Sequence, residues 1–563
     1  MGKRLVDQRN RFGIRKLSVG VCSVVVATCF LGATTSYAEE QAENSEPREE
    51  RVETSDVDHQ GKEEKTVNEH QEESEHASAA TSEKENGAVS QGTEASQPAT
   101  SLDEETEIAD YGPLPSKAQM QYHREELAAF IHFGMNTYYD REWGDGQEDP
   151  YYFYPEHLDT DQWIKTLKDA GFKRTIMVVK HHDGFLLYPS KYTDHTIAKS
   201  GWKDGKGDVL AEVSASASKY DMDMGVYLSP WDAHSPLYHV DTEDQYNEYY
   251  LNQLKEILED PKYGNKGKFV EVWMDGARGD GAQKVTYTFD KWFEAIRKAQ
   301  GDIAIFSAEP TNVRWIGNEK GIAGDPVWQK VNPDKIRNNP SNSYLNHGHP
   351  EGKQYSVGEA DVSIRSGWFY HDNQEPKSLR ELMDIYFKSV GRGTPLLLNI
   401  PPNQDGKFAD ADVARLKEFR QTLAQLYSVD YAVGALVEDD STRRNVLYKA
   451  SHLTDGDEKT SWAPADDAKT GSFVLDLGKE QYFDVVELKE TIEKGQRISG
   501  FTIDVAVNGQ WVPYGAGSTV GYRRLIKGQP VDSRYIRVSI TDAQATPILN
   551  QSLIHISEPT RLR

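Results

Sequence analysis

Cysteine is nearly missing from this sequence. Among 563 residues only Cys22 and Cys29 are cysteine, and both lie in an apolar stretch near the N-terminus. Beyond that stretch the chain can form no disulfide, and it can use neither a cysteine nucleophile nor a thiolate metal site. We therefore expect the folded part to be stabilised by a hydrophobic core of ordinary size.

Residues 39–110 contain no phenylalanine, tryptophan or tyrosine. The same segment has 23 Asp and Glu against 5 Lys and Arg, and so it carries most of the formal net charge of -26. Such a composition buries too little apolar surface to offset chain entropy. The sequence predicts a disordered acidic linker over 39–110. The alternative is an acidic tail that binds a partner.

Long hydrophobic runs are also missing, with one short exception. Residues 17–32 are apolar, follow a basic start and precede small residues that end at Ala38. Because about 20 residues are needed to span a bilayer, this run is typical of a cleaved signal peptide over 1–38. We expect no membrane span after its removal. No basic run follows residue 110, which argues against nucleic acid and anionic lipid as partners.

Residues 111–430 alternate short apolar runs with amphipathic segments. The segment 157–172 has a helical pattern, for example, and 174–180 reads as a buried strand. No glycine-rich dinucleotide fingerprint follows the first expected strand at 128–137, which disfavours a doubly wound nucleotide-binding sheet. The pattern predicts an α/β domain with a (β/α)8-like barrel. In such barrels the chemistry gathers at the C-terminal ends of the strands.

Histidine, tryptophan and carboxylate side chains recur at these expected strand ends. A sugar pocket needs flat apolar surfaces for C–H groups and hydrogen-bond partners for hydroxyls, and this mixture provides both. Plain alternatives are core packing for His132 and the tryptophans, a helix cap for Asp275, and a metal pair for His181 and His182. No HExxH or CxxC spacing occurs, and we expect no metal site. The candidates are His132, Trp143, His181, His182, Trp231, Asp232, His234, Trp273, Asp275, Glu309 and Glu319.

Six segments spread in order over 115–430 together resemble a known family. They are HFGMNTYYDREWGDG, VVKHHDGF, GVYLSPWD, VEVWMDGARG, RWIGNEKG and LLLNIPPNQDG, and they are similar to glycoside hydrolase family 29, the retaining α-L-fucosidases. The resemblance implies that Asp275 is the nucleophile and Glu319 the acid/base. It also implies a fucose pocket made by His132, Glu142, Trp143, His181, His182, Trp231 and Trp273, with Arg314, Tyr227 and Trp368 as weaker candidates.

The resemblance further implies a substrate and a location. The EWGDG and GNEKG segments are similar to the subgroup that acts on α-1,3 and α-1,4 fucosyl branches of oligosaccharides or glycoprotein glycans. No cofactor is required for such hydrolysis. RFGIRKLSVG near the N-terminus resembles the YSIRK-type signal of Gram-positive cocci, which implies export toward the cell surface.

Several alternatives stay open at this point. Strand-end position alone favours Glu309 over Glu319 as the acid/base, because Glu309 ends the expected strand 303–309. A non-catalytic fucose-binding adhesin and an exo-glycosidase of another specificity, such as an α-galactosidase, are the competing functions.

The hydrophobic pattern changes in residues 431–551. Apolar and polar residues alternate between turn signals, which predicts an antiparallel β-sandwich. SHLTDGDEKTSWAP and FVLDLG resemble discoidin-like, carbohydrate-binding sandwiches, for which a structural calcium ion is common, although no reliable ligand set is visible. We expect this domain to brace the barrel. The last segment, 552–563, does not read like the rest and resembles a translated sequencing adapter, so we interpret it as a non-native tail.

Overall fold

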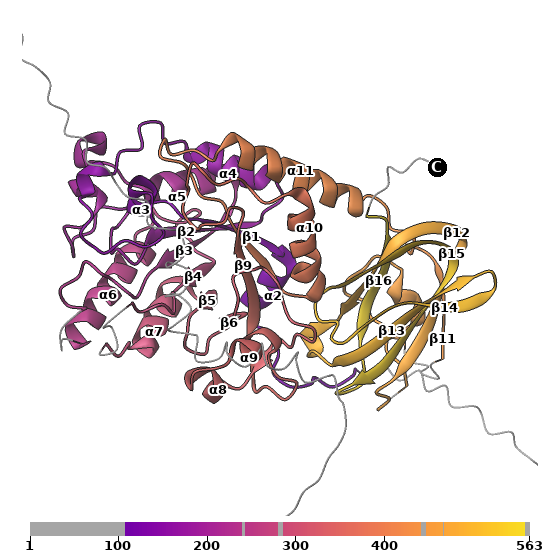
Figure 1. Cartoon of the computed structure of the whole chain (residues 1–563). Helices are drawn as coiled ribbons and strands as arrows, with labels where there is room; N and C mark the ends of the chain where they lie inside the picture. The colour runs from indigo at the N-terminus through magenta and orange to yellow at the C-terminus, as the bar shows by residue number, and fades with distance from the viewer. Residues whose placement is uncertain (1–106, 239–242, 280–284, 441–445, 466, 558–563) are drawn as a thin grey trace, which may run out of the picture. The chain divides into compact units, whose positions relative to one another are not determined.

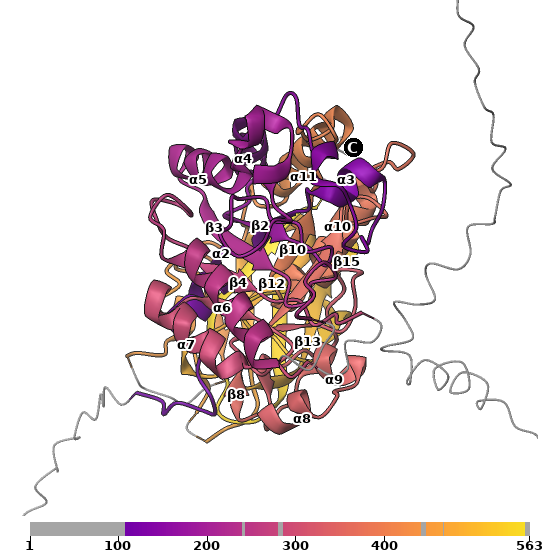
Figure 2. The same cartoon turned by 90° about the vertical axis from the view of Figure 1, so that its left-hand side faces the viewer.

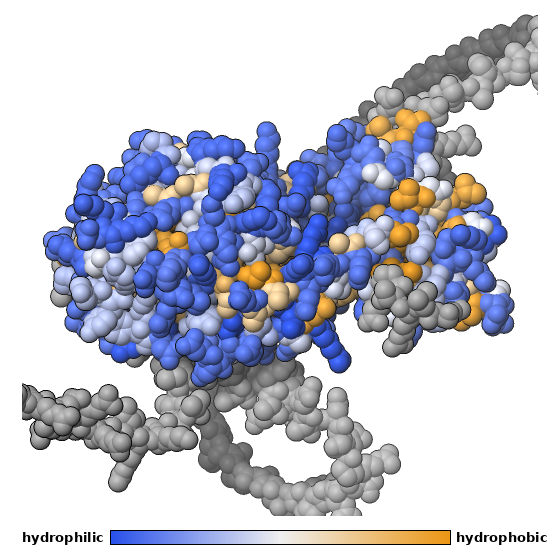
Figure 3. All heavy atoms as spheres, turned by 90° about the horizontal axis from the view of Figure 1, so that it is seen from above, coloured by the Kyte–Doolittle hydropathy of each residue, from blue (hydrophilic) through white to orange (hydrophobic). Residues whose placement is uncertain are grey.

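The computed structural model describes residues 107–238, 243–279, 285–440, 446–465 and 467–557. The expected signal peptide and all but the last residues of the expected acidic linker lie outside these ranges. Among the helices inside them, none combines the length and the apolar character that crossing a membrane requires. The face drawn in Figure 3 is mostly hydrophilic, with apolar residues in small separate groups.

Eight parallel strands close into a barrel, as the sequence predicts (Figure 1). Around the barrel the order is β1-β10-β9-β6-β5-β4-β3-β2, so the first and last strands pair, with Leu127 opposite Leu396. The strands are β1 (Leu127–Ile131), β2 (Arg174–Lys180), β3 (Asp223–Leu228), β4 (Glu271–Trp273), β5 (Ala304–Phe306), β6 (Val313–Trp315), β9 (Val357–Ser363) and β10 (Leu396–Asn399).

The barrel strands are buried on both faces, as expected for a parallel sheet covered by helices. Alternate residues along a strand pack into two different hydrophobic clusters. Phe130, Tyr227 and Trp273 belong to the cluster inside the barrel, whereas Ala129 and Val272 belong to the cluster between barrel and helices. Because strand side chains alternate, Asp275 lies on the interior side like Trp273, just past the end of β4.

Helices cover the outside of the barrel (Figures 1 and 2). In α4, for example, Asp159 caps the first turn by accepting the Gln162 N–H, and Trp163, Ile164 and Leu167 pack against the barrel. The helices are α2 (Lys117–Glu125), α3 (Met135–Tyr139), α4 (Thr160–Asp169), α5 (Val209–Tyr220), α6 (Glu243–Leu258), α7 (Phe289–Gln300), α8 (Pro333–Arg337), α9 (Asn342–His347), α10 (Leu379–Lys388) and α11 (Asp410–Leu426).

The βα alternation breaks between β5 and β9. The described chain passes from β5 to β6 through residues 307–312 without a helix, and β6 is followed by α8, α9 and the two-stranded sheet of β7 (Lys330–Val331) and β8 (Gln354–Tyr355). The expected strand 303–309 therefore ends early, at Phe306. Glu309 consequently lies in a connection and not at a strand end.

The C-terminal part forms an antiparallel sheet domain of the predicted sandwich type. Its strands are ordered β11-β12-β15-β13-β14, and β16 pairs with β12. Residues such as Ile536, Val538 and Ile540 alternate into its core. The last strand runs to His555, so residues 552–555 belong to the sheet. The strands are β11 (Leu436–Asp439), β12 (Gly471–Glu490), β13 (Ile498–Val507), β14 (Gln510–Gly517), β15 (Arg524–Ala543) and β16 (Leu549–His555).

Candidate active site

Asp275 lies at the C-terminal end of β4 with both carboxylate oxygens engaged. Its Oδ2 accepts a hydrogen bond from the Tyr227 hydroxyl at 2.9 Å, and its Oδ1 accepts one from the Ala277 N–H at 2.8 Å. The His182 Nε2 lies 3.7 Å from Oδ2. The side chain is still 24 % exposed. These contacts fix the orientation of the carboxylate, while its exposed part leaves it accessible to a substrate.

Three histidines surround this carboxylate. The His132 Nδ1 contacts the Asn399 Oδ1 at 2.8 Å, and the His182 Nδ1 contacts the Ser229 Oγ at 2.8 Å. The His181 and His182 rings are 4.1 Å apart, and the His132 and His181 rings 5.8 Å apart. His181 and His182 are adjacent in sequence, yet both side chains reach the pocket. They can do so because β2 ends at Lys180, after an irregularity in its pairing with β3.

Burial keeps these histidines uncharged. Loss of water lowers the pKa of His132 to about 4, and burial also lowers the pKa values of His181 and His182. At neutral pH each ring therefore has one N–H donor and one acceptor nitrogen. The Nδ1 atoms of His132 and His182 are bonded to Asn399 and Ser229, so Nε2 is the atom that each of these rings can present to a sugar hydroxyl.

Three of the predicted tryptophans lie around the same pocket. The Trp231 ring stacks on His182 with centroids 4.6 Å apart, and Trp143 meets Trp231 edge-on at 5.2 Å. Trp143 is 38 % exposed and so lies at the rim. Trp273 lies deeper, stacked on Phe306 at 3.8 Å and on Tyr227 at 5.1 Å, and forms part of the pocket floor.

Glu142 is held from the loop that follows β9. Its Oε2 accepts the backbone N–H of Trp368 at 2.7 Å, and its Oε1 lies 2.6 Å from the His371 Nε2. The Trp368 indole N–H points to the Glu319 Oε2 at 3.4 Å. Trp368 also lies 5.2 Å from the His132 ring, so this loop closes one side of the pocket.

Glu319 and Glu309 face different surroundings. Glu319 is exposed on its loop, yet partial loss of water around its carboxyl group raises its pKa, and the charges of Asp275 and Glu142 act in the same direction. Glu309 instead forms an ion pair with Arg337 on the outside of the barrel. Of these two glutamates, the structure places Glu319 near Asp275.

Sequence reasoning missed several residues of this pocket. Asp361 on β9 is a buried carboxyl group that accepts the Trp315 indole N–H at 3.0 Å, and burial together with Glu319 raises its pKa well above the usual range. Asn399, His371 and Asp361 all lie on β9, β10 or the loop between β9 and α10. The strand-end rule, applied at the end of β9, would single out that loop. Arg314, a weaker candidate, is buried and donates to backbone carbonyl groups of Leu345, Trp328 and Ser356.

Asp232 and His234, also named from the sequence, support the rim. Asp232 Oδ2 pairs with the buried Lys180 at 3.2 Å, and its Oδ1 accepts the Ser235 N–H at 2.9 Å. The His234 Nδ1 lies 2.7 Å from the Gly146 carbonyl oxygen of the EWGDG segment. In the part of the chain that the structure describes, no group of three or more His, Asp or Glu side chains is placed to hold a metal ion.

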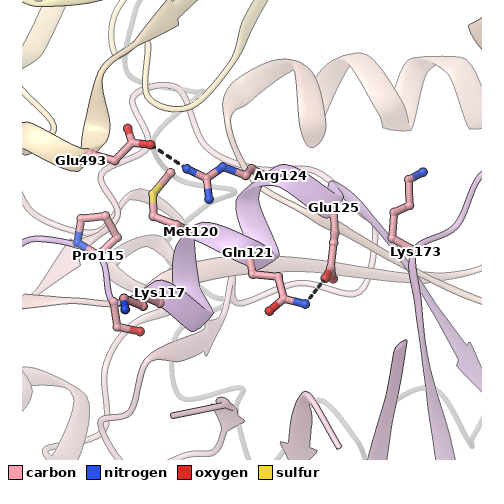
Figure 4. Close-up of a pocket in the computed structure, with 9 residues that line it drawn as sticks. Pro115, Lys117, Met120, Gln121, Arg124, Glu125, Lys173 and Glu493 are labelled. Carbon is pink, nitrogen blue, oxygen red and sulfur yellow. Dashed lines mark hydrogen bonds and ion pairs between the residues drawn. The ribbon is translucent and has the colours of Figure 1, made fainter. Parts of the chain in front are cut away.

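A separate depression lies at the opposite, amino-terminal end of the barrel (Figure 4). Two contacts join its lining residues: Arg124 pairs with Glu493 at 3.1 Å, and Gln121 donates to Glu125 at 2.7 Å. It lacks the aromatic walls and the histidines of the Asp275 pocket. Because barrel chemistry gathers at the carboxyl ends of strands, the candidate active site is the pocket around Asp275.

A barrel with paired carboxyl groups, neutral histidines and aromatic walls at its carboxyl end is the architecture of a glycoside hydrolase. The family model for alpha-L-fucosidase matches residues 114–425, a model for the F5/8 type C domain matches 438–551, and one for the YSIRK type signal peptide matches 7–32. The chain belongs to the α-L-fucosidases of glycoside hydrolase family 29.

Individual relatives agree with this assignment. The chain is 39 % identical over 442 residues to the putative alpha-L-fucosidase 1 of Oryza sativa subsp. japonica, covering 78 % of this chain and 84 % of the relative. The crystal structure of SpGH29 is similar with 57 % identity and a TM-score of 0.79, over 80 % of this chain and 100 % of that one. A Ruminococcus gnavus GH29 fucosidase in complex with fucose shows 40 % identity and a TM-score of 0.76, over 82 % and 98 %.

Proposed function

We propose that this α-L-fucosidase is an exo-acting, retaining enzyme in which Asp275 is the nucleophile and Glu319 the acid/base. The observation that carries the proposal is the contrast between two neighbouring carboxyl groups. Asp275 is held at a strand end by two hydrogen bonds to its carboxylate oxygens, whereas the surroundings of Glu319 raise its pKa and favour its proton. A raised pKa favours the protonated form that a general acid needs.

The mechanism follows as a double displacement. Asp275 attacks the anomeric carbon of fucose while Glu319 gives its proton to the departing glycosidic oxygen, so a fucosyl ester forms and the C–O bond to the aglycone breaks. Glu319, now ionised, then removes a proton from water. That water attacks the anomeric carbon, fucose leaves with its original configuration, and Asp275 returns as a carboxylate.

Sugar recognition is assigned to the neutral histidines and Glu142, with tryptophans as apolar walls. The Nδ1 atoms of His132 and His182 contact Asn399 and Ser229, so each ring presents its Nε2 to a hydroxyl group. His181 adds a third neutral ring, and Trp143 and Trp231 offer flat surfaces. An apolar wall against the C6 methyl group rejects an added hydroxyl only modestly, so the hydrogen bonds to the ring hydroxyls provide most selectivity. The fucose-bound relative from Ruminococcus gnavus supports fucose as the ligand of this pocket.

We assign the substrate to terminal α-1,3- or α-1,4-linked fucose on branched oligosaccharides or glycoprotein glycans. The support is the presence of the EWGDG and GNEKG segments and their placement, since Glu142 and Glu319 both contact Trp368. The YSIRK-type signal indicates secretion through a Gram-positive pathway, and we infer that the enzyme acts at or outside the cell surface.

The deciding experiment replaces the nucleophile and measures fucose release. The variant Asp275→Asn keeps the size of the side chain but removes the attacking charge, and turnover should fall about 10⁴-fold or more. Fucose binding should persist, because the histidines are intact. Wild-type enzyme should release fucose from α-1,3- and α-1,4-linked oligosaccharides faster than from α-1,2-linked ones. Normal turnover by Asp275→Asn would refute the nucleophile assignment, and equal rates on all linkages would refute the substrate assignment.

A further inference from the structure

The loop after β9 meets the segment after α3 through a single histidine. The His371 Nε2 lies 2.6 Å from the Glu142 Oε1, and its Nδ1 lies 2.5 Å from the Asp140 Oδ1. Since a carboxylate is only an acceptor, satisfying both contacts requires both ring nitrogens to donate. The geometry therefore favours a protonated ring fixed between two carboxylates.

The surroundings of His371 agree with this geometry. Burial disfavours the charged ring, but the hydrogen bonds and negative charges of Asp140 and Glu142 outweigh burial and raise the pKa of His371 above its usual 6.5. Its side chain is 12 % exposed, whereas that of Asp140 is 75 % exposed. Water screens the contact to Asp140 more than the contact to Glu142.

Glu142 is linked through Trp368 to Glu319, the proposed acid/base. Glu142 accepts the Trp368 N–H with its second oxygen, and the Trp368 indole points to Glu319. Packing is close here, because a Cβ added to Gly367 would lie 2.1 Å from the Glu142 Oε1. Asn399, which also contacts His132, donates to the Trp368 carbonyl oxygen at 2.7 Å. A shift of Glu142 would therefore disturb Trp368 and Glu319 as well.

We propose that His371 is a positioning residue that clamps Glu142 against the fucose and, through Trp368, keeps Glu319 in place. The proposal rests on the proposed functions of Glu142 and Glu319. Both ring nitrogens of His371 are taken up by Asp140 and Glu142, so His371 acts on the sugar through the carboxylate that it fixes.

The clamp makes activity depend on pH in a defined direction. The charged groups that face the ring are Asp140 and Glu142, both from the segment after β1, while the neighbouring Asp372 lies exposed on the loop itself. Below its raised pKa the ring donates to both carboxylates. As the pH rises through that pKa the ring loses one donor and its positive charge, which weakens the remaining hydrogen bond to Glu142 even if the contact to Asp140 is the one that breaks, and activity falls on the alkaline side.

The test compares three variants with wild-type enzyme in kcat and KM for fucose release, measured across the range in which histidine titrates. His371→Asn removes the titration and the double contact. We expect kcat/KM to fall about 10- to 100-fold, as for other hydrogen bonds to charged groups, with KM rising because Glu142 is displaced and kcat falling because Glu319 is displaced with it. Its alkaline limb should no longer show the ionisation of His371.

Asp140→Asn leaves every contact to Glu142 in place but removes one of the two charges beside the ring. Its alkaline limb should move to lower pH while activity at lower pH stays close to wild type. Asp372→Asn is the matched control, because it removes a neighbouring exposed carboxylate that does not face the ring, and its profile should not move. Unchanged KM and pH profile in His371→Asn, or an unmoved limb in Asp140→Asn, would overturn the clamp.

The same assay separates this inference from the proposed function. Fucose release by wild type and its loss in Asp275→Asn support the nucleophile whatever the clamp variants do. If His371→Asn does not fold, as shown by circular dichroism, Asp140→Asn alone decides the matter, since its side chain is exposed. Full activity in Asp275→Asn would instead mean that the proposed function has failed.

Discussion

At the scale of single residues, the carboxyl groups of Asp275 and Glu319 are chemically similar but have different neighbours. Asp275 is held at the end of β4 by hydrogen bonds from the Tyr227 hydroxyl and a backbone N–H. Glu319 lies on a loop, where it has one long hydrogen bond, from Trp368 at 3.4 Å, and negative neighbours. A fixed carboxylate suits attack at one carbon atom, and a looser acid suits proton transfer to oxygens that move.

The acid/base assignment predicts a difference between leaving groups. Glu319→Gln cannot donate a proton, so release of fucose from an oligosaccharide should fall about 10²- to 10⁴-fold. An activated aryl fucoside departs with little protonation, and the formation of the fucosyl–enzyme from it should be far less impaired. Pre-steady-state kinetics with both substrates measure this contrast.

Glu309→Gln is the matched control for that variant. The same Glu-to-Gln change is made at a glutamate whose ion-pair partner, Arg337, is 51 % exposed. We expect unchanged kinetics and a loss of stability below about 1 kcal/mol, as for other surface ion pairs. If Glu309→Gln lost activity and Glu319→Gln did not, the two roles would have to be exchanged.

At the scale of elements, β9 supplies the polar interior of the barrel. Glu359, Asp361 and Ser363 alternate along it and face inward. Glu359 Oε1 accepts the Trp273 indole N–H at 2.8 Å, and Ser363 Oγ accepts from Asn399 at 2.9 Å. Trp273 in turn stacks on Tyr227, which donates to Asp275. One strand thus supports the pocket floor and, through Asn399, the His132 ring.

Glu359 predicts an unusual dependence of stability on pH. Burial first, and the nearby Glu271 second, raise its pKa well above the ordinary 4.5, so the folded state keeps it protonated. Its contribution to stability is complete below the unfolded-state pKa. Above pH 4.5 that contribution declines, because the unfolded chain releases the proton and the folded chain does not, until the pH passes the folded-state pKa.

Glu359→Gln mimics the neutral acid and removes this penalty. Relative to wild type, the variant should gain stability as the pH rises from about 4.5 toward neutrality, since only the wild-type group still titrates there. Thermal unfolding followed over that pH range measures the difference in Tm. Glu359→Leu, which leaves the Trp273 N–H without a partner, should be less stable at every pH. A constant difference in Tm between wild type and Glu359→Gln would contradict a neutral Glu359.

The barrel and its strand ends could be predicted from the sequence because both are local patterns. Asp275, His132, His181 and His182 follow apolar runs directly, so topology alone brings them together. The contacts of β9 could not be predicted in this way, because Glu359 meets Trp273 and Asp361 meets Trp315 across the barrel. The position of Glu309 was misjudged for a related reason: β5 ends at Phe306, and no local signal marks that early end.

At the scale of the whole molecule, the C-terminal domain packs against the barrel and adds a side chain to its interior. Ile492, which follows β12, is buried in the same cluster as Tyr122, Tyr227 and Trp273 inside the barrel. Tyr522 stacks on His123 of α2 at 5.6 Å. Arg523 pairs with Glu126 of the barrel and with Glu487 of β12, both at 3.1 Å. These contacts support a bracing role for the sandwich domain.

Arg523 provides the sharpest test of that role. Its replacement in Arg523→Met removes the cation shared by Glu126 and Glu487, which are 18 % and 1 % exposed, and leaves two carboxylates without it in a buried interface. Breaking a buried ion pair in this way costs about 3–5 kcal/mol. Denaturant unfolding followed by both fucose release and tryptophan fluorescence should show the barrel losing activity at lower denaturant concentration.

In Arg537→Met, the matched control, a pair with Asp504 is lost within the sheet domain, where Arg537 is 36 % exposed. That change should cost about 1 kcal/mol or less. Equal effects of the two variants would mean that the interface braces the barrel no more than a surface contact does, whereas a large loss confined to Arg523→Met would show that the interface stabilises the barrel.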